Sequence, residues 1–509
     1  MDTDFDLLIV GGGVNGAGIA RDAAGRGLKV LLVEQDDLAG HTSSASSKLI
    51  HGGIRYLEHY EFRLVSEALA ERERLLGIAP HLIRPLRFVL PHDRRMRPAW
   101  MIRIGIFLYD HLGRRQRLPG STGLRLPGSP LGAGLKASFK RGFAYWDCWG
   151  DDARLVAMNA KDAAEHGAEI AVRTRLMSAR REGAVWTAQL EDRQGGAQRT
   201  VTARAVVNAT GGWAGHFLSQ ALGVGEKGAL RLIKGSHIVT RRLYEGEHAY
   251  VLQNPDRRIV FVIPYEGRYT LIGTTDIPWD GPLEKVTPDP AEIEYLCESV
   301  NRFMAAPIAP SDVVWSYAGL RPLHDDESGD PSAISRDYVL EVDGGPDLAP
   351  VLSVFGGKIT THRALAEHAL QKLEPLLGNM GPAWTATRPL PGGGVKDGDI
   401  GAFALELARI APFVPAETAQ RWAHAYGTRA LNLLGDARSL ADLGEDFGAG
   451  LTQREVDYLV REEWARTAED ILWRRSKLGL HITAEGAAKL AAYLAEGGGG
   501  SLSLAPGPV

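Results

Sequence analysis

The chain has 509 residues, a length at which one hydrophobic core usually gives way to two or three domains. Hydrophobic residues make up 44% and charged residues 24%, which excludes a disordered chain. With 58 basic and 62 acidic residues the formal net charge is -4, so the composition argues against a protein built around nucleic acid.

The first 34 residues read as strand, glycine turn, helix and strand. Apolar runs at 7–10 and 30–33 flank a helix-like stretch, a pattern typical of parallel strands covered on both faces. Gly11, Gly13 and Gly16 form G-x-G-x-x-G directly after the first strand, where such glycines allow a tight turn, a close approach of pyrophosphate and close helix packing. Glu34 ends the second strand, where its carboxylate can accept hydrogen bonds from ribose hydroxyls.

Neither of the next two segments is enough by itself to predict a cofactor site. Residues 43–48, Ser-Ser-Ala-Ser-Ser-Lys, can wrap a pyrophosphate or a flavin with hydroxyl and N–H donors, or they form a solvated surface loop. Residues 206–211, which end at Gly211, form a strand followed by a small-residue turn that can approach a flat cofactor, or an ordinary strand-to-helix turn. The glycine motif itself does not separate FAD from NAD.

Residues 98–112 combine large apolar side chains with basic flanks. This composition suits an interfacial helix on anionic lipid, but it also suits a helix buried in the core. We favour the buried helix because apolar residues cover nearly all faces. Residues 473–477, Trp-Arg-Arg-Ser-Lys, are a second basic aromatic candidate for a membrane surface and are equally ambiguous.

Later apolar runs at 205–207, 259–263, 269–272 and 351–354 fit a mixed α/β body. Gly356-Gly357-Lys358 is not a nucleotide triphosphate loop, because Leu352 replaces its first glycine and Ile359 its magnesium-binding hydroxyl. We expect the glycine pair to open a helix whose positive end faces the flavin ring.

The run Pro-Leu-Pro-Gly-Gly-Gly at 389–394 predicts a linker. Beyond it we expect a helical domain over residues 389–496, including a capping box at 452–455, and a flexible tail over 497–509. The two cysteines, Cys148 and Cys297, lie in no metal or disulfide spacing. We therefore expect no metal site. No signal peptide or membrane-spanning stretch is recognisable, so we also expect a cytoplasmic protein.

The chain resembles the aerobic, FAD-dependent glycerol-3-phosphate dehydrogenases of bacteria. The likeness is carried in order by TSSASSKLIHGGIRYLE at 42–58, RLIKGSH at 231–237, IGTTD at 272–276, GLRPL at 319–323, VFGGKITT at 354–361 and DLGEDFG at 442–448. It covers nearly the whole chain apart from the tail.

The resemblance implies an α/β fold with a Rossmann-like FAD-binding domain interleaved with a mostly β substrate domain over residues 1–388, plus the α-helical C-terminal domain. It also implies oxidation of sn-glycerol 3-phosphate to dihydroxyacetone phosphate, with electrons passing through FAD to a membrane quinone. A peripheral position on an anionic lipid surface at the inner face of the cell membrane and a homodimer follow from the same likeness.

Site residues follow from the matched motifs together with the chemistry. A phosphorylated polyol is a dianion, so its pocket needs fixed positive charge. Histidine is the natural base near neutral pH for the alcohol proton; His237 is our first choice and His51 our second. The expected substrate-binding residues are Arg55, Tyr56, Arg321, Arg336 and Lys358, and Arg321 is also expected to take part in catalysis. The expected cofactor-binding residues are Gly11, Gly13, Asn15, Gly16, Glu34, Thr42, Ser43, Ser47, Gly211, Gly357, Lys358 and Thr360.

Three other functions stay open on the sequence. A glycerophosphate oxidase of the same family would pass its electrons to oxygen. An amine or amino-acid oxidase would usually need one arginine for a carboxylate, so the cationic cluster counts against it. A non-catalytic flavin-binding protein would hold FAD that glycerol 3-phosphate does not bleach.

Overall fold

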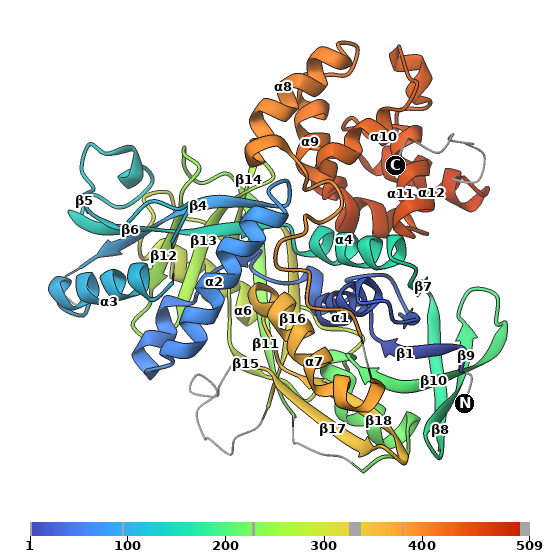
Figure 1. Ribbon diagram of the computed structural model, residues 1–509. Helices are drawn as coiled ribbons and strands as arrows, with labels where there is room; N and C mark the ends of the chain where they lie inside the picture. Colours follow the sequence, from blue (N-terminus) through green and yellow to red (C-terminus); the bar gives the residue numbers. More distant parts are fainter. Residues whose placement is uncertain are drawn as a thin grey trace.

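The computed structural model describes residues 3–93, 96–113, 115–225, 230–324, 337–378 and 380–498. They form two β-sheets in one body and a group of helices that packs against it (Figure 1). The chain passes repeatedly between the two sheets before it enters the C-terminal helices. The expected interleaved α/β fold is therefore confirmed.

The first sheet has the order β17-β18-β10-β1-β2-β7, and its five strands from β18 to β7 run parallel. Its strands are β1 (Phe5–Val10), β2 (Val30–Val33), β7 (Glu169–Ala171), β8 (Thr174–Glu182), β9 (Val185–Asp192), β10 (Gln198–Asn208), β17 (Val339–Gly345) and β18 (Leu348–Phe355). One face is covered by α1 (Val14–Gly25), α4 (Asp152–Glu165) and α7 (His362–Leu377). The β8–β9 hairpin covers the other face, so residues 7–10 of β1 and all of β2 are apolar because both of their faces are buried.

The second sheet has the order β15-β11-β14-β13-β12-β4-β6-β3, with β16 on β11 and β5 on β6. It is antiparallel except where β12 meets β4. Its strands are β3 (Leu49–Ile50), β4 (Ile83–His92), β5 (Thr122–Arg125), β6 (Arg141–Gly150), β11 (Leu230–Arg241), β12 (Ala249–Gln253), β13 (Ile259–Tyr265), β14 (Tyr269–Gly273), β15 (Ile277–Pro278) and β16 (Val313–His324). One face packs on α2 (Phe62–Ile78) and α3 (Ala99–Leu112), and the other on α6 (Pro290–Asn301).

The C-terminal helices enclose a core of their own. They are α8 (Ile400–Ile410), α9 (Ala416–Tyr426), α10 (Ala430–Leu434), α11 (Gln453–Glu463) and α12 (Ala484–Ala495). Figure 1 shows this group above α4, which it contacts. The glycine run before it is packed rather than loose, because a Cβ on Gly392 would lie 2.1 Å from the carbonyl oxygen of Tyr426. Residues 499–509 of the expected tail lie outside the described residues.

The expected capping box at 452–455 is wrong, although α11 does begin there. Thr452 makes no side-chain cap, and Glu455 is fully buried among other partners. Its carboxylate accepts hydrogen bonds from Trp422 Nε1 at 2.9 Å and Tyr426 Oη at 2.6 Å, and it pairs with Arg421. A carboxylate buried in this core needs such hydrogen-bond and ion-pair partners. Glu455 therefore bonds to them instead of capping the N-terminus of α11.

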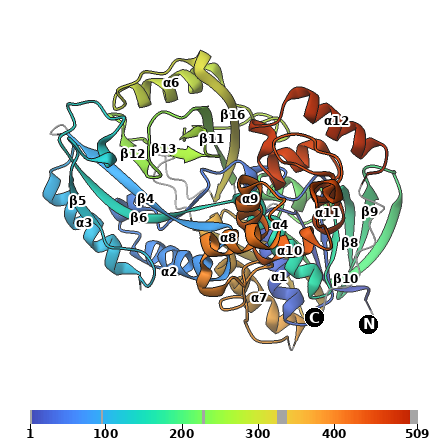
Figure 2. The ribbon, with the colours of Figure 1, turned by 90° about the horizontal axis from the view of Figure 1, so that it is seen from above.

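The favoured interpretation of residues 98–112 as a buried helix is also wrong. Helix α3 buries only a narrow stripe, Ile106 and Tyr109, against α2. Trp100, Ile104 and Phe107 are 63%, 51% and 51% exposed. Figures 1 and 2 place α3 at the edge of the molecule farthest from the C-terminal helices. Among the described residues, none of the helices has the length and hydropathy needed to cross a membrane.

Candidate active site

A cavity of about 630 Å³ lies where the carboxyl ends of the parallel strands meet the second sheet. This edge is the usual ligand position in open α/β sheets. The following expected site residues line it: Gly11, Gly13, Asn15, Glu34, Thr42, Ser43, Ser47, His51, Tyr56, Gly211, His237, Arg321, Gly357, Lys358 and Thr360. Residues 300 positions apart in the chain therefore share one cavity.

The glycine turn after β1 is held by contacts that allow no side chain. Gly11 has φ +111°, and a Cβ on Gly16 would lie 1.9 Å from the carbonyl oxygen of Gly11. Gly16 does not line the cavity; its part is to let α1 approach the strand. At the start of α1 the Val14 N–H donates to Ser43 Oγ at 3.0 Å, which brings the second loop onto the helix N-terminus.

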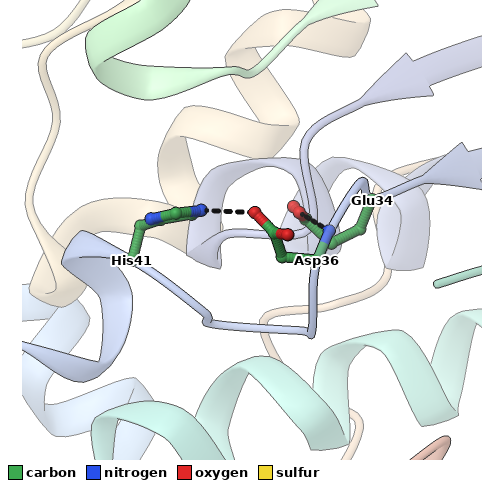
Figure 3. A group of neighbouring side chains, drawn as sticks. All are labelled: Glu34, Asp36 and His41. Carbon is green, nitrogen blue, oxygen red and sulfur yellow. Dashed lines mark hydrogen bonds and ion pairs between the residues drawn. The ribbon is translucent and has the colours of Figure 1, made fainter. Parts of the chain in front are cut away.

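Glu34, Asp36 and His41 cluster at one end of the cavity (Figure 3). The Glu34 carboxylate accepts the Gly12 N–H at 2.6 Å and the Asp36 N–H at 2.8 Å. Burial raises the pKa of Glu34 above its ordinary value, and these backbone donors offset only part of that rise. His41 Nε2 lies 3.0 Å from Asp36 Oδ2, a hydrogen bond that lowers the pKa of Asp36. The backbone bonds fix the Glu34 carboxylate in orientation, as recognition of a ribose requires.

Residues 42–48 form a wall of the cavity rather than a solvated loop. Thr42 Oγ1 donates to the Leu320 carbonyl at 2.8 Å. Lys48, in the left-handed region with φ +57°, is buried and reaches Asp152 Oδ2 at 2.8 Å. These contacts join the loop to β16 of the second sheet and to the start of α4, which is why a polar run is ordered here.

The opposite end of the cavity carries positive charge. Arg321, on β16, is paired with Asp276, and its Nη2 donates to Thr274 Oγ1 at 3.0 Å. The Lys358 ammonium lies 3.7 Å from the centre of the Tyr56 ring. Cations at one end and a dinucleotide turn at the other suit an anionic substrate placed next to a cofactor.

His237, on β11, lies between these two ends. Its ring stacks on Tyr317 at 4.9 Å, and its Nε2 lies 2.8 Å from Ser47 Oγ. Burial, and then the charges of Arg321 and Lys48, lower the pKa of His237 to about 3. The imidazole is therefore neutral at physiological pH, the form that can accept a proton.

Besides Gly16, two more expected residues do not line the cavity or cannot be placed. Arg55 lies in the helical turn 54–59 beside Tyr56 but is not part of the cavity wall. Arg336 lies outside the described residues.

Several site features were missed in the sequence, although the motifs at 231–237 and 272–276 contain all of them except Phe261. Thr274 lines the cavity and, with Asp276, holds the Arg321 guanidinium. Two glycines leave room for site residues, since a Cβ on Gly273 would lie 2.1 Å from His237 Cδ2 and one on Gly235 would lie 2.4 Å from Arg321 Nη2. Phe261 also lines the cavity, and its signal was only that of an ordinary core strand.

The residues present fit an FAD molecule. Asn15 donates through Nδ2 to the Gly356 carbonyl at 3.3 Å, while its buried Oδ1 has no hydrogen-bond partner among the described residues. Gly357 has φ +101°, and this turn opens α7 toward the cavity. An unsatisfied acceptor and two helix N-termini supply hydrogen-bonding groups for a flavin and its phosphates.

The chain is similar in sequence and fold to FAD-dependent oxidoreductases. Residues 6–363 match the family described as FAD dependent oxidoreductase, and residues 383–496 match the C-terminal domain of alpha-glycerophosphate oxidase. The chain is 56% identical over 490 residues to a glycerol-3-phosphate dehydrogenase of Pseudomonas aeruginosa, covering 96% of this chain and 95% of that one. It is 50% identical to a D-erythritol 1-phosphate dehydrogenase of Brucella abortus, covering 94% and 95%. A glycerol-3-phosphate dehydrogenase from Bacillus halodurans, solved with FAD, superposes with a TM-score of 0.73 at 26% identity, covering 97% and 94%.

Proposed function

This chain belongs to the family of FAD-dependent glycerol-3-phosphate dehydrogenases, and from that premise we propose that it oxidises sn-glycerol 3-phosphate to dihydroxyacetone phosphate. The observation that supports the reaction is the single cavity that joins the Glu34 end to the cationic end at Arg321 and Lys358, with a neutral His237 between them. Bound FAD supplies the hydride acceptor.

The protein's own part is to bind, orient and deprotonate the substrate. Arg321 and Lys358 bind the phosphate dianion, and the Asp276 and Thr274 contacts hold the guanidinium in one plane. His237 takes the hydroxyl proton at Nε2, the ring nitrogen that lies 2.8 Å from Ser47 Oγ in the cavity wall. His51, which also lines the cavity, is the second candidate for this base.

The test of the function is reduction of the bound flavin. We expect sn-glycerol 3-phosphate to bleach the flavin absorbance of the holoenzyme without oxygen, while glycerol and the opposite enantiomer leave it unchanged. A spectrum that sn-glycerol 3-phosphate does not alter would contradict the proposal and favour a non-catalytic flavoprotein or an amine oxidase.

A second candidate substrate is D-erythritol 1-phosphate, on which the relative named above is described as acting. Both compounds pair a phosphate with a nearby secondary alcohol, so the cationic end does not separate them. We expect kcat/KM to favour glycerol 3-phosphate by about tenfold or more, the usual scale for a small group that the pocket must accommodate. Parallel stopped-flow reduction by both compounds measures the ratio, and a ratio below one would reassign the substrate.

We further propose a membrane quinone as the electron acceptor and a homodimer as the assembly. The rival acceptor is oxygen, as in a glycerophosphate oxidase. We expect a soluble quinone analogue to be reduced at each turnover, with little peroxide in its absence; stoichiometric peroxide without quinone would overturn this part. Sedimentation of the purified protein tests the dimer.

Helix α3 is the surface that we propose to lie on anionic lipid at the inner face of the membrane. Its exposed Trp100, Ile104 and Phe107 form an apolar face, and Arg97 and Arg103 lie beside it. Apolar side chains flanked by arginines are typical of helices in the lipid headgroup region. Arg94, Arg95 and Arg114 also flank the helix in sequence but lie outside the described residues.

Replacing Phe107 by glutamate should weaken binding to vesicles that contain anionic lipid by about tenfold, since burial of an aromatic side chain contributes about 1.5–3 kcal/mol. Co-sedimentation with vesicles measures this. The control is Leu405→Glu on α8, an equally apolar residue that is 76% exposed on the C-terminal helices. Equal loss in both variants, or none in Phe107→Glu, would remove α3 as the docking surface.

A further inference from the structure

Residues 473–477, called the clamp segment below, leave the C-terminal helical domain and reach the wall of the cofactor cavity. Residues 473–475 are the end of η11 (Asp470–Arg475), a π-helical turn. Lys477, two residues further on, has a left-handed backbone with φ +59°. Both are uncommon conformations that need support from their surroundings. Arg475 and Lys477 are buried, so the interpretation of this segment as a membrane surface is excluded.

The first contact is with the loop 34–41, which starts at Glu34. Arg475 forms a two-pronged pair with Asp37, with Nη2 at 2.7 Å from Oδ1 and Nη1 at 2.9 Å from Oδ2. Arg474 Nε adds a third bond to Asp37 Oδ2 at 2.6 Å. Asp37 is buried and lies three residues after Glu34, so the clamp segment holds the loop that carries this carboxylate.

The second contact reaches the loop 42–48 through Asp151 and Asp152 at the start of α4. Lys477 Nζ lies 3.2 Å from Asp151 Oδ1 and 3.5 Å from Asp152 Oδ1. Asp152 in turn binds Lys48 Nζ at 2.8 Å and accepts from Ser46 Oγ at 2.8 Å. Burial raises the pKa of Asp152, but Lys48 and Lys477 outweigh it and hold the pKa at about 2. The ion cluster thus stays charged and ties the loop to the C-terminal domain.

The third contact is a stack of aromatic rings. Trp473 stacks on Trp315 at 4.4 Å, and Trp315 lies 4.9 Å from Tyr317. The Tyr317 hydroxyl donates to the Ser46 carbonyl at 2.8 Å, and the Tyr317 ring stacks on His237. The same five-residue segment therefore reaches both cofactor loops and the strand that faces them.

We propose that the clamp segment positions the two cofactor loops, so that the C-terminal domain sets the affinity of the protein for FAD. A buried ion pair is weak evidence for a gain in stability, because desolvation offsets much of the attraction. What it does supply is fixed geometry, and a loop already held in its bound shape loses less entropy when the ligand arrives. The inference rests on FAD binding in this cavity and not on the identity of the substrate.

The test is the dissociation constant of FAD for the Lys477→Met variant. Apoprotein prepared from the full-length holoenzyme is titrated with FAD, and flavin fluorescence reports binding. We expect the dissociation constant to rise at least about tenfold, with a smaller FAD-induced rise in melting temperature. The matched control is Lys489→Met in the same domain, whose exposed ammonium pairs with Glu445 and which should bind FAD like the wild type.

A merely structural role would lower the melting temperature of the apoprotein and leave the FAD dissociation constant unchanged, and that result would overturn the proposal. If Lys477→Met does not fold, Trp473→Leu and Arg475→Lys decide the question by the same titration, because leucine keeps apolar bulk without the ring stack and lysine keeps the charge without the two-pronged pair. Wild-type holoenzyme that glycerol 3-phosphate fails to bleach would refute the proposed function without affecting this result.

Discussion

Replacing Arg321 by methionine should lower kcat/KM for sn-glycerol 3-phosphate by about 100- to 1,000-fold. Removing one member of a charge pair to a bound anion costs about 3–4 kcal/mol, and the loss applies to the transition state as well as to the ground state. The Arg321 guanidinium is held toward the cavity by Asp276 and Thr274, so a neutral side chain also leaves the Asp276 carboxylate beside the substrate phosphate. Flavin reduction by stopped flow without oxygen measures the effect.

Arg302→Met is the control for this prediction, because Arg302 lies on the surface with Glu298 3.7 Å away. It should stay within about twofold of the wild type, as most surface pairs contribute little. If Arg321→Met lost less than threefold, Arg321 would not bind the phosphate, and Lys358 would be the next cation to test.

The second large effect is expected for His237→Asn. Loss of a general base typically slows the chemical step by about 100- to 10,000-fold. Asparagine keeps most of the volume between Ser47 and Tyr317, so the cavity wall should remain in place. The same substitution at His51 should have a smaller effect on the rate of flavin reduction. A larger loss in His51→Asn would assign the base to His51 instead.

The pH dependence provides an independent check on His237. Its pKa in the folded protein is lowered to about 3 from an ordinary 6.5, so the free enzyme should show no loss of kcat/KM from this group near pH 6.5. The unfolded chain binds the proton first as the pH falls. The contribution of this neutral histidine to the free energy of unfolding is therefore present above pH 6.5 and is lost as the pH falls toward 3. Acid unfolding of His237→Asn should depend less on pH in that range.

Local patterns in the sequence determined the cofactor end of the site. Strands at 7–10 and 30–33, the turn at Gly11 and the carboxylate at Glu34 follow from short-range rules, and all four lie where those rules place them. The reason is that a tight turn, an apolar strand and a helix N-terminus are set by residues within a few positions of one another. The order of motifs also identified the family, which the comparisons confirm.

Only the tertiary structure decided which faces are covered. Residues 98–112 and 473–477 both combine tryptophan with arginine, yet α3 exposes its apolar face while the clamp segment is buried on Asp37 and Asp152. At 452–455 the helix start was predictable, but the partners of Glu455 come from a helix about 30 residues away. Periodicity is a local property of the chain, whereas burial, ion pairing and the meeting of Arg321 with His237 depend on contacts between distant segments, which no local pattern encodes.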